Sequence, residues 1–248
     1  MKISIVGYGQ MGHLIKQIAI GRGIDVVSII DPYQKDATHK EFCAEAMKEV
    51  DTCICFSQPD VAIKNIEDAC QWGKQIVVGT TGWTEHMAAI EKQITAQKLG
   101  MVYSSNFSIG VNIFFKMVEQ AAQIINKFDI YDIMGFEGHH LKKRDSPSGT
   151  AETIANLLIS NIDRKTKLVS EKLDRKVKPD ELHFASLRGG HIPGTHQVLF
   201  DSEADTIELK HVVRNRTGLA TGAVYAAEWI VGRQGLYTEA DMMKELVG

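Results

Sequence analysis

Residues 2–12 read KISIVGYGQMG, a short β-rich run that leads directly into a G-x-G-x-x-G motif. The next residues carry apolar side chains at helical spacing, at Met11, Leu14, Ile15 and Ile18. They predict a helix over residues 10–21, and the run 26–30 predicts the strand that follows it. That strand ends in Asp31, 19 residues after Gly12, where a dinucleotide-binding unit places an acid for the adenosine ribose. The stretch therefore predicts a Rossmann-type unit.

The pattern continues beyond this unit. β-rich runs over residues 52–56, 75–78 and 101–103 each end in a small, polar, turn-forming cluster. Ligands of open parallel sheets bind beyond the carboxyl ends of the strands, so these clusters are candidates for the nicotinamide end of a dinucleotide. The alternative for the clusters after residues 78 and 103 is an ordinary turn between strand and helix. The expected cofactor contacts are Gly7, Tyr8, Gly9, Gln10, Met11, Gly12, Asp31, Gly79, Thr80, Thr81, Ser104, Ser105, Asn106 and Phe107.

The choice between the two pyridine nucleotides depends on the residues after the second strand. Asp31 is followed by Pro32 and not by an arginine. A carboxylate at this position accepts a hydrogen bond from a free ribose 2′-hydroxyl and repels a 2′-phosphate. The sequence therefore favours NAD(H). A cation at Lys35 would weaken this preference, so NADP(H) remains the alternative.

The composition is that of an ordinary soluble globular protein. The 248 residues are 44% hydrophobic and 24% charged, and 28 basic against 31 acidic residues leave a net charge of −3. This balance indicates no nucleic-acid partner and no membrane partner, and no run approaches the roughly 20 apolar residues of a membrane helix. The N-terminal residues do not resemble a signal peptide. The four cysteines, Cys43, Cys53, Cys55 and Cys70, read as buried free thiols rather than a zinc site or a disulfide framework, which favours a cytoplasmic location.

Residues 137–150 combine histidines, cations and a Ser148-Gly149-Thr150 turn. The strand expected over 129–136 and the helix expected over 150–162 place both histidines where the chain is turning, just before a helix N-terminus. Unpaired backbone N–H groups and the helix dipole favour an anion at that point. The basic and titratable members of the run are His139, His140, Lys142, Lys143 and Arg144. Such a loop holds a carboxylate or phosphate and moves a proton. The alternative is a solvated basic loop whose Ser148 only caps the helix.

The second half changes its periodicity. A helix is expected over residues 112–125, and β-like runs follow the loop at 183–187, 196–200 and 206–213. The polar stretch 163–181 is expected to be an exposed loop, and a last helix is expected over 222–231. The predicted fold class is α/β: an N-terminal Rossmann-type parallel sheet and a second α+β domain with a mixed sheet. The expected boundaries are 1–107 for dinucleotide binding, 108–216 for substrate binding and oligomerisation, and 217–248 for a segment packing back on the first domain.

These motifs together resemble the dihydrodipicolinate reductase family over nearly the whole chain. The matching segments are residues 7–12, 78–82, 105–111, 137–150 and 188–196, and every fixed position of the family signature E-x-H-H-x-x-K-x-D-x-P-S-G-T is filled. The departures, Gly138, Ser146, Leu219 and Gln10, remove no chemical role. The resemblance implies pyridine-nucleotide-dependent reduction of 4-hydroxy-tetrahydrodipicolinate, via dihydrodipicolinate, to tetrahydrodipicolinate in the diaminopimelate route to lysine. It also implies a homotetramer built through the second domain's sheet.

The resemblance also assigns roles within residues 137–150. It implies that His139 is the proton donor and Lys143 the second catalytic residue. His140, Gly149 and Thr150 would bind the substrate, the last two as a carboxylate-binding turn. Lys142 and Arg144 are then expected to face solvent.

Three other readings of the sequence stay open. Another two-domain dehydrogenase would share the Rossmann half but has no need of His-His-x-x-Lys beside Ser-Gly-Thr. A non-catalytic dinucleotide sensor would bind the cofactor without turnover. A metal enzyme is disfavoured because neither H-x-x-x-H nor H-E-x-x-H occurs, so no metal ligands are expected.

Overall fold

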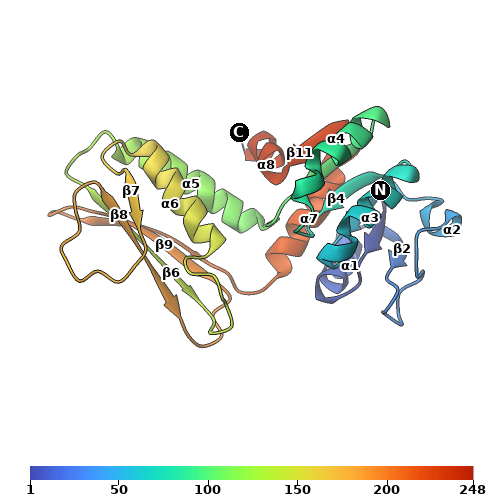
Figure 1. Cartoon of the computed structure of the whole chain (residues 1–248), viewed down its shortest axis with the longest axis horizontal. Coiled ribbons are helices and arrows are strands. Elements are labelled where there is room, and N and C mark those ends of the chain that lie inside the picture. The colour runs from blue at the N-terminus through green and yellow to red at the C-terminus, as the bar shows by residue number, and fades with distance from the viewer. Residues whose placement is uncertain (248) are drawn as a thin grey trace. The chain divides into compact units, whose positions relative to one another are not determined.

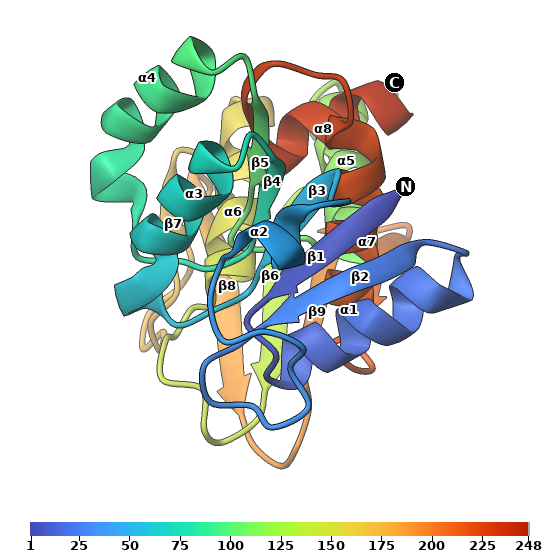
Figure 2. The ribbon, with the colours of Figure 1, turned by 90° about the vertical axis from the view of Figure 1, so that its right-hand side faces the viewer.

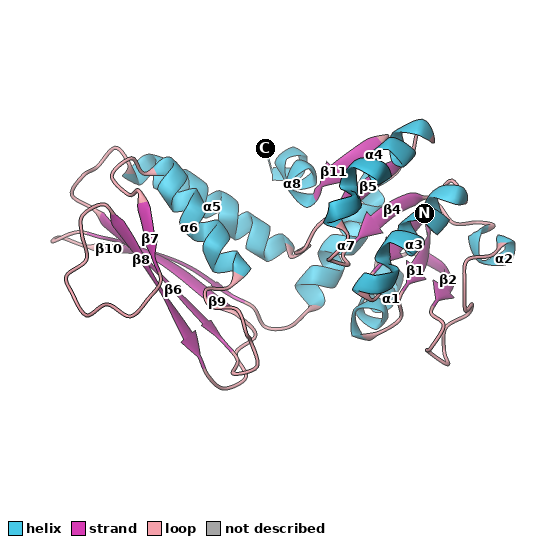
Figure 3. Cartoon of the chain, in the orientation of Figure 1, coloured by secondary structure: helices cyan, strands magenta, loops and turns pink. Residues whose placement is uncertain are grey.

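The computed structural model describes residues 1–247, which form two compact units. Unit 1 contains Met1–Ile109 together with the chain from Arg216 onward, and unit 2 contains Gly110–Asn215. Each unit has its own hydrophobic core and its own sheet, as the separate groups of strands in Figure 3 show. The predicted fold class is confirmed. No helix among residues 1–247 is long and apolar enough to cross a membrane.

Unit 1 is built on a parallel sheet in the order β11-β5-β4-β3-β1-β2. Its strands carry almost continuous apolar side chains, because helices cover both faces of the sheet and bury alternate residues on each side. The strands are β1 (Lys2–Val6), β2 (Asp25–Ile30), β3 (Thr52–Cys55), β4 (Gln75–Val78), β5 (Gly100–Tyr103) and β11 (Gly235–Thr238).

Two helical layers enclose this sheet. One core joins the sheet to α1, α7 and α8, and a second core joins it to α2, α3 and α4. Figure 2 shows α3 and α4 on one side of the strands and α1 on the other. The helices are α1 (Gln10–Gly21), α2 (Ala44–Met47), α3 (Ala62–Gln71), α4 (Met87–Ala96), α7 (Thr217–Ile230) and α8 (Glu239–Val247), with short 3₁₀ turns η1 (Pro59–Val61) and η2 (Thr84–His86).

Helix α7 packs closely on the first part of the chain. A Cβ at Gly222 would lie 1.7 Å from the carbonyl oxygen of Phe107, so only glycine permits this approach. The alanines that follow are fully buried in the same core, and their small side chains let the helix lie close to the sheet. The chain after Arg216 therefore completes the core of unit 1.

Unit 2 is a mixed sheet in the order β10-β9-β6-β8-β7, in which β6 is parallel to β8 and antiparallel to β9. Helices α5 and α6 lie side by side against one face of it (Figure 1). The strands are β6 (Asp132–His139), β7 (Lys167–Val169), β8 (Glu181–Arg188), β9 (Thr195–Asp201) and β10 (Thr206–Val212), and the helices are α5 (Ile109–Ile125) and α6 (Gly149–Asn161).

The strand expected over 129–136 is wrong in its position. β6 runs three residues further and ends at His139, because Ile133, Gly135 and Glu137 share the buried face with that histidine. Adjacent residues on a strand face opposite ways. His139 is therefore fixed by the sheet, and only His140 lies in the turn that was expected to hold both histidines.

Three elements in the second half of the chain were not predicted. The stretch 163–181 was expected to be an exposed loop, yet β7 lies within it and the Lys165 side chain is buried. The Lys165 ammonium donates to the carbonyl oxygens of Pro179, at 2.9 Å, and Glu181, at 2.8 Å, and lies 2.6 Å from Asp132. A buried lysine is stable there because its ammonium has an oxygen partner for each of its three hydrogen-bond donors. The other two, β11 and α8, follow the last predicted helix.

Candidate functional site

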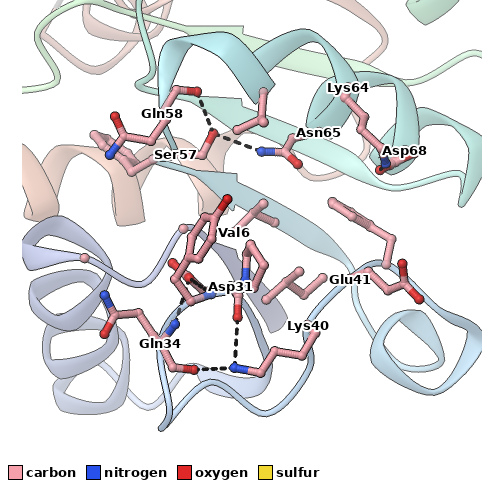
Figure 4. Close-up of a pocket in the computed structure, with 18 of the residues that line it drawn as sticks. Val6, Asp31, Gln34, Lys40, Glu41, Ser57, Gln58, Lys64, Asn65 and Asp68 are labelled. Atoms are coloured by element: carbon pink, nitrogen blue, oxygen red, sulfur yellow. Dashed lines mark hydrogen bonds and ion pairs between the residues drawn. The ribbon is translucent and has the colours of Figure 1, made fainter.

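Unit 1 contains a pocket of about 560 Å³ at the carboxyl ends of β1, β2 and β3 (Figure 4). Five of the predicted cofactor residues line it: Gly7, Gly9, Gln10, Met11 and Asp31. A crevice beyond the carboxyl ends of parallel strands is where this class of sheet binds its ligands.

The three glycines of the G-x-G-x-x-G motif have different structural roles. Gly7 has a φ of +90°, and a Cβ there would lie 2.3 Å from the carbonyl oxygen of Phe56. A Cβ at Gly12 would lie 2.4 Å from the oxygen of Gly7, so that glycine lets α1 start close to the strand. Gly9 caps α1 without any side-chain bond, and nothing lies within 4 Å of its Cβ position. The uncapped N–H groups of α1 fit a pyrophosphate.

Asp31 organises one wall of the pocket. Its Oδ2 accepts from the backbone N–H of Tyr8 at 2.8 Å, and its Oδ1 accepts from those of Tyr33 at 2.8 Å and Gln34 at 3.0 Å. Burial raises the pKa of this carboxyl, but these three N–H donors and the Lys40 ammonium lower it more, so the pKa lies below its usual range. The carboxylate is therefore ionised and held in one orientation.

Several pocket residues stand outside the predicted list of cofactor contacts. Tyr33, Gln34 and Lys40 come from the loop after β2, and Ser57 and Gln58 follow β3. The Lys40 ammonium donates to the carbonyl oxygen of Gln34 at 2.7 Å (Figure 4). Ser57 and Gln58 belong to the turn after residues 52–56, which the sequence indicated as a candidate cluster without naming them as contacts. Nothing in the pattern distinguished Lys40 from Lys35, and Lys35 does not line the pocket.

The other predicted cofactor residues do not line this pocket. Tyr8 and Phe107 are buried in the core, and a Cβ at Gly79 would overlap the ring of Phe56. Thr80 accepts from the backbone N–H of Ser57 at 2.9 Å, and Ser104 accepts from that of Asn106 at 2.9 Å. Thr81 and Ser105 belong to the same two turns. In unit 1 these residues shape the turns beyond β4 and β5, and their contact with a cofactor stays a prediction.

Unit 2 gathers a buried cluster around Glu137 and His139, which point to the same side of β6. The Glu137 carboxylate is fully buried, and its Oε2 is hydrogen-bonded to His139 Nδ1. Its Oε1 accepts from Arg188 Nη2 at 2.7 Å and from the backbone N–H of Ser148 at 3.2 Å. Both carboxylate oxygens are thus satisfied within the protein.

Ser148 and His196 complete the cluster. The Ser148 hydroxyl accepts from the backbone N–H of Ala151 at 3.2 Å, which caps α6, and the same oxygen lies 3.3 Å from His196 Nε2. The His196 ring stands edge-on to that of His139, with 5.2 Å between ring centroids. Ser148 does cap the helix, as the alternative in the sequence analysis expected, but it also contacts Glu137 and His196. Glu137, Arg188 and His196 were not recognised as site residues from the sequence.

Burial and hydrogen bonding move the protonation of these groups in opposite directions. Burial raises the pKa of Glu137, but the hydrogen bond from Arg188 and the charges of His139 and Arg188 bring it below its usual range. Burial lowers the pKa of His139 more than Glu137 raises it. Burial also lowers the pKa of His196 to about 4. Near neutral pH, Glu137 is an anion and His196 is neutral.

The predicted anion-binding residues lie on the turn that follows the cluster. Lys143 Nζ lies 2.9 Å from Asp145 Oδ2, and this lysine lowers the pKa of the Asp145 carboxyl. His140 Nδ1 is buried without a hydrogen-bond partner among the described residues. Gly149 begins α6 with nothing within 4 Å of its Cβ position, and Thr150 follows it half-buried. Lys142 and Arg144 are exposed, as expected.

Glu137, His139 and His196 each place a potential metal-ligand atom within 4.8 Å of the others. The bonding already present does not suit a metal ion, however. Glu137 is committed to His139 on one oxygen and to Arg188 on the other. The guanidinium lies 2.7 Å from the carboxylate and would repel a cation bound there. The cluster is better described as a hydrogen-bonded chain.

Comparison with known proteins agrees with both units. Residues 1–107 match the family model of the N-terminus of dihydrodipicolinate reductase, and residues 110–243 match that of its C-terminus. The chain belongs to the dihydrodipicolinate reductase family. The resemblance noted in the sequence is thereby confirmed.

Two relatives in the dihydrodipicolinate reductase family match over nearly their full length. The 4-hydroxy-tetrahydrodipicolinate reductase of Christiangramia forsetii is 35% identical over 246 residues, which cover 99% of each chain. That of Archaeoglobus fulgidus is 34% identical and covers 98% of this chain and 100% of its own. A dipicolinate-bound dihydrodipicolinate reductase from Paenisporosarcina sp. TG-14 has the same fold, with a TM-score of 0.76 at 21% identity over 96% and 97% of the two chains.

The fold reaches beyond the dihydrodipicolinate reductase family. An amine dehydrogenase from Mycobacterium smegmatis aligns with a TM-score of 0.61 at 11% identity, covering 97% of this chain and 95% of its own. This likeness concerns architecture alone. The other two-domain dehydrogenases considered from the sequence therefore share the scaffold, and the family models separate this chain from them.

Proposed function

We propose that the protein reduces 4-hydroxy-tetrahydrodipicolinate, via dihydrodipicolinate, to tetrahydrodipicolinate with a pyridine nucleotide, in the diaminopimelate route to lysine. The observation that carries the proposal is the buried Glu137–His139 pair at the end of β6, next to the turn with Lys143 and the start of α6. It combines a proton-transfer group with donors for a carboxylate. The pocket of unit 1 supplies the complementary requirement, a dinucleotide site.

Each part of the chain then has a defined task. A bound pyridine nucleotide supplies the hydride. His139, when protonated, gives a proton to the carbon that must receive one, and Gly194 leaves space before its Nε2. Lys143, His140 and the Gly149-Thr150 turn bind a substrate carboxylate and orient the ring. The lysine charge also stabilises the negative charge that develops on the ring nitrogen during reduction.

An absorbance assay of nucleotide oxidation with freshly made substrate tests this function. Turnover that depends on the substrate supports it. A protein that binds NADH without turnover would be a sensor, and turnover only with other amino or hydroxy acids would indicate a different dehydrogenase. A parallel titration of nucleotide binding by calorimetry separates an inactive preparation from a non-catalytic protein.

We propose that NADH is the preferred cofactor, because the ionised Asp31 faces the pocket. Asp31→Ala is expected to lower the ratio of kcat/KM for NADH over NADPH about tenfold, since it removes the repulsion of a 2′-phosphate. Steady-state kinetics with both nucleotides measure the ratio. Asp36→Ala removes an exposed acid of the same loop that does not line the pocket, and it should leave the ratio unchanged. A strong NADPH preference in the wild type would contradict the proposal.

We propose a homotetramer built through the sheet of unit 2. The face of this sheet away from α5 and α6 carries exposed apolar side chains, among them Met134, Leu187 and Val212. Sheet register places them on one surface, since Leu187 lies beside Gly138, which pairs with Thr195, and Thr195 pairs with Val212. An apolar face of this kind favours association. The protein's free thiols agree with the cytoplasm as its proposed compartment.

Leu187→Glu is expected to break this assembly into smaller species, because it places a charge in a buried apolar contact. Analytical ultracentrifugation measures the mass. Ile20→Glu changes an equally exposed apolar residue in unit 1 and should leave the mass unchanged. A wild type that sediments as a monomer would contradict the proposal.

A further inference from the structure

We propose that Glu137 is the positioning residue of His139: it holds the imidazole with Nδ1–H directed inward, so that Nε2 is the atom that gives its proton to the substrate. The inference deepens the proposed function, since it rests on His139 as the proton donor. Glu137 acts through His139 and has no contact with substrate in this scheme.

The first support is the way in which the carboxylate is fixed. Oε1 accepts from Arg188 and from the backbone of Ser148, so the group cannot rotate freely. Only Oε2 is left, and it is bonded to His139 Nδ1. An ionised carboxylate only accepts hydrogen bonds, so Nδ1 must carry the hydrogen. In neutral His139, Nε2 is then the unprotonated nitrogen and takes up the catalytic proton.

The second support is the position of Arg188. Its guanidinium donates to Glu137 at 2.7 Å, to the carbonyl oxygen of Asp145 at 2.6 Å and to that of Leu187 at 2.7 Å. These bonds hold the arginine in place and tie the turn before α6 to the end of β8. The arginine keeps Glu137 ionised in a buried position where an isolated carboxyl would take up a proton. Glu137 is therefore an anion beside His139 near neutral pH.

The third support is the space around Nε2. A Cβ at Gly194 would lie 3.1 Å from His139 Nε2 and 3.5 Å from Cδ2. Any larger residue at this position would crowd the atom that has to reach a substrate. His196 packs edge-on against the His139 ring, with 5.2 Å between ring centroids. The ring is thus bonded on its Nδ1 side, and on its Nε2 side it faces a residue without a side chain.

The charged and titratable groups that face His139 are Glu137 on the same strand, Arg188 on β8, His196 on β9 and Lys143 on the following turn. Glu137 is the only anion among them, and it opposes the burial and the cations that disfavour the imidazolium. Removing its charge must lower the pKa of His139 further. A donor that has to be protonated is active below its pKa and inactive above it. The alkaline limb of activity must then move to lower pH.

Glu137→Gln tests this, because glutamine keeps the size of the side chain and loses the charge. We expect the alkaline limb of kcat/KM to move at least one pH unit lower, with about a tenfold loss of kcat/KM above it. We also expect ¹⁵N NMR of labelled histidine to show His139 in one tautomer in the wild type and in a mixture in the variant. Nucleotide affinity should be unchanged.

Glu181→Gln is the matched control. Glu181 is another fully buried carboxylate of unit 2, held by Arg175 at 2.7 and 2.8 Å. Glu181→Gln also removes the charge of a buried carboxylate paired with an arginine, so it should lower stability in a similar way. It should leave the pH limb and the His139 tautomer unchanged. Glu137→Asp is the second variant. It keeps the charge but draws the carboxylate back by one methylene, so we expect a smaller shift of the pH limb in the same direction. This variant tests the role of Glu137 if Glu137→Gln does not fold.

The outcomes separate this inference from the proposed function. A wild-type pH limb and a wild-type tautomer in a folded Glu137 variant would overturn the positioning role. The positioning role would also be overturned if Glu181→Gln changed the His139 tautomer as much as Glu137→Gln does. If the wild type does not turn over the proposed substrate, the NMR spectra still decide the role of Glu137, and only the substrate assignment fails.

Discussion

Replacing His139 by alanine is expected to lower kcat by about 10²- to 10⁴-fold, the usual contribution of a positioned general acid. The affinity for NADH should stay the same, because the nucleotide pocket lies in unit 1 and His139 belongs to unit 2. Steady-state kinetics give kcat, and calorimetry or fluorescence gives the dissociation constant of the nucleotide.

His183→Ala provides the control for this variant. His183 is a half-buried histidine on β8 in the same unit, outside the cluster around Glu137. It should keep wild-type turnover. Unchanged turnover in His139→Ala would end the assignment of this histidine as the proton donor, whereas loss of nucleotide binding would point to a folding defect.

Replacing Lys143 by alanine is expected to lower kcat/KM by about 10²- to 10³-fold, in the range found for a single charge-stabilising donor. Two effects combine here. The substrate carboxylate loses a cation, and Asp145, which the lysine neutralises at 2.9 Å, becomes a repulsive neighbour. We therefore expect kcat to fall and KM to rise together, so the two roles of Lys143 cannot be divided by this variant alone.

Lys142→Ala is the control for Lys143, because it removes a neighbouring exposed lysine and the same amount of charge. It should leave kcat/KM within about twofold, as expected of a solvated surface charge. NADH affinity is measured in both variants and should not change. A Lys143 variant with wild-type kcat/KM would contradict both the binding role and the catalytic role.

Much of the fold follows from local pattern. The helix expected over 10–21 coincides with α1, and the strand expected over 75–78 coincides with β4, because apolar periodicity and turn residues agree in these segments. The prediction failed where tertiary contacts decide. β6 extends to His139 because β8 and β9 pair with it on both sides up to its last residues. β7 and the buried Lys165 depend on partners such as Asp132, far away in the sequence.

The sequence by itself determined the nucleotide-binding half, the family and the run of residues in which the chemistry is expected. Each of these depends on residues close together in the chain. Only the tertiary structure decided which atoms of that run are held, and by what. Arg188 is 51 positions from Glu137, and His196 is 48 positions from Ser148. The physical reason is sheet register: β8 and β9 flank β6, and their side chains surround Glu137 and His139 in a way that no local pattern records.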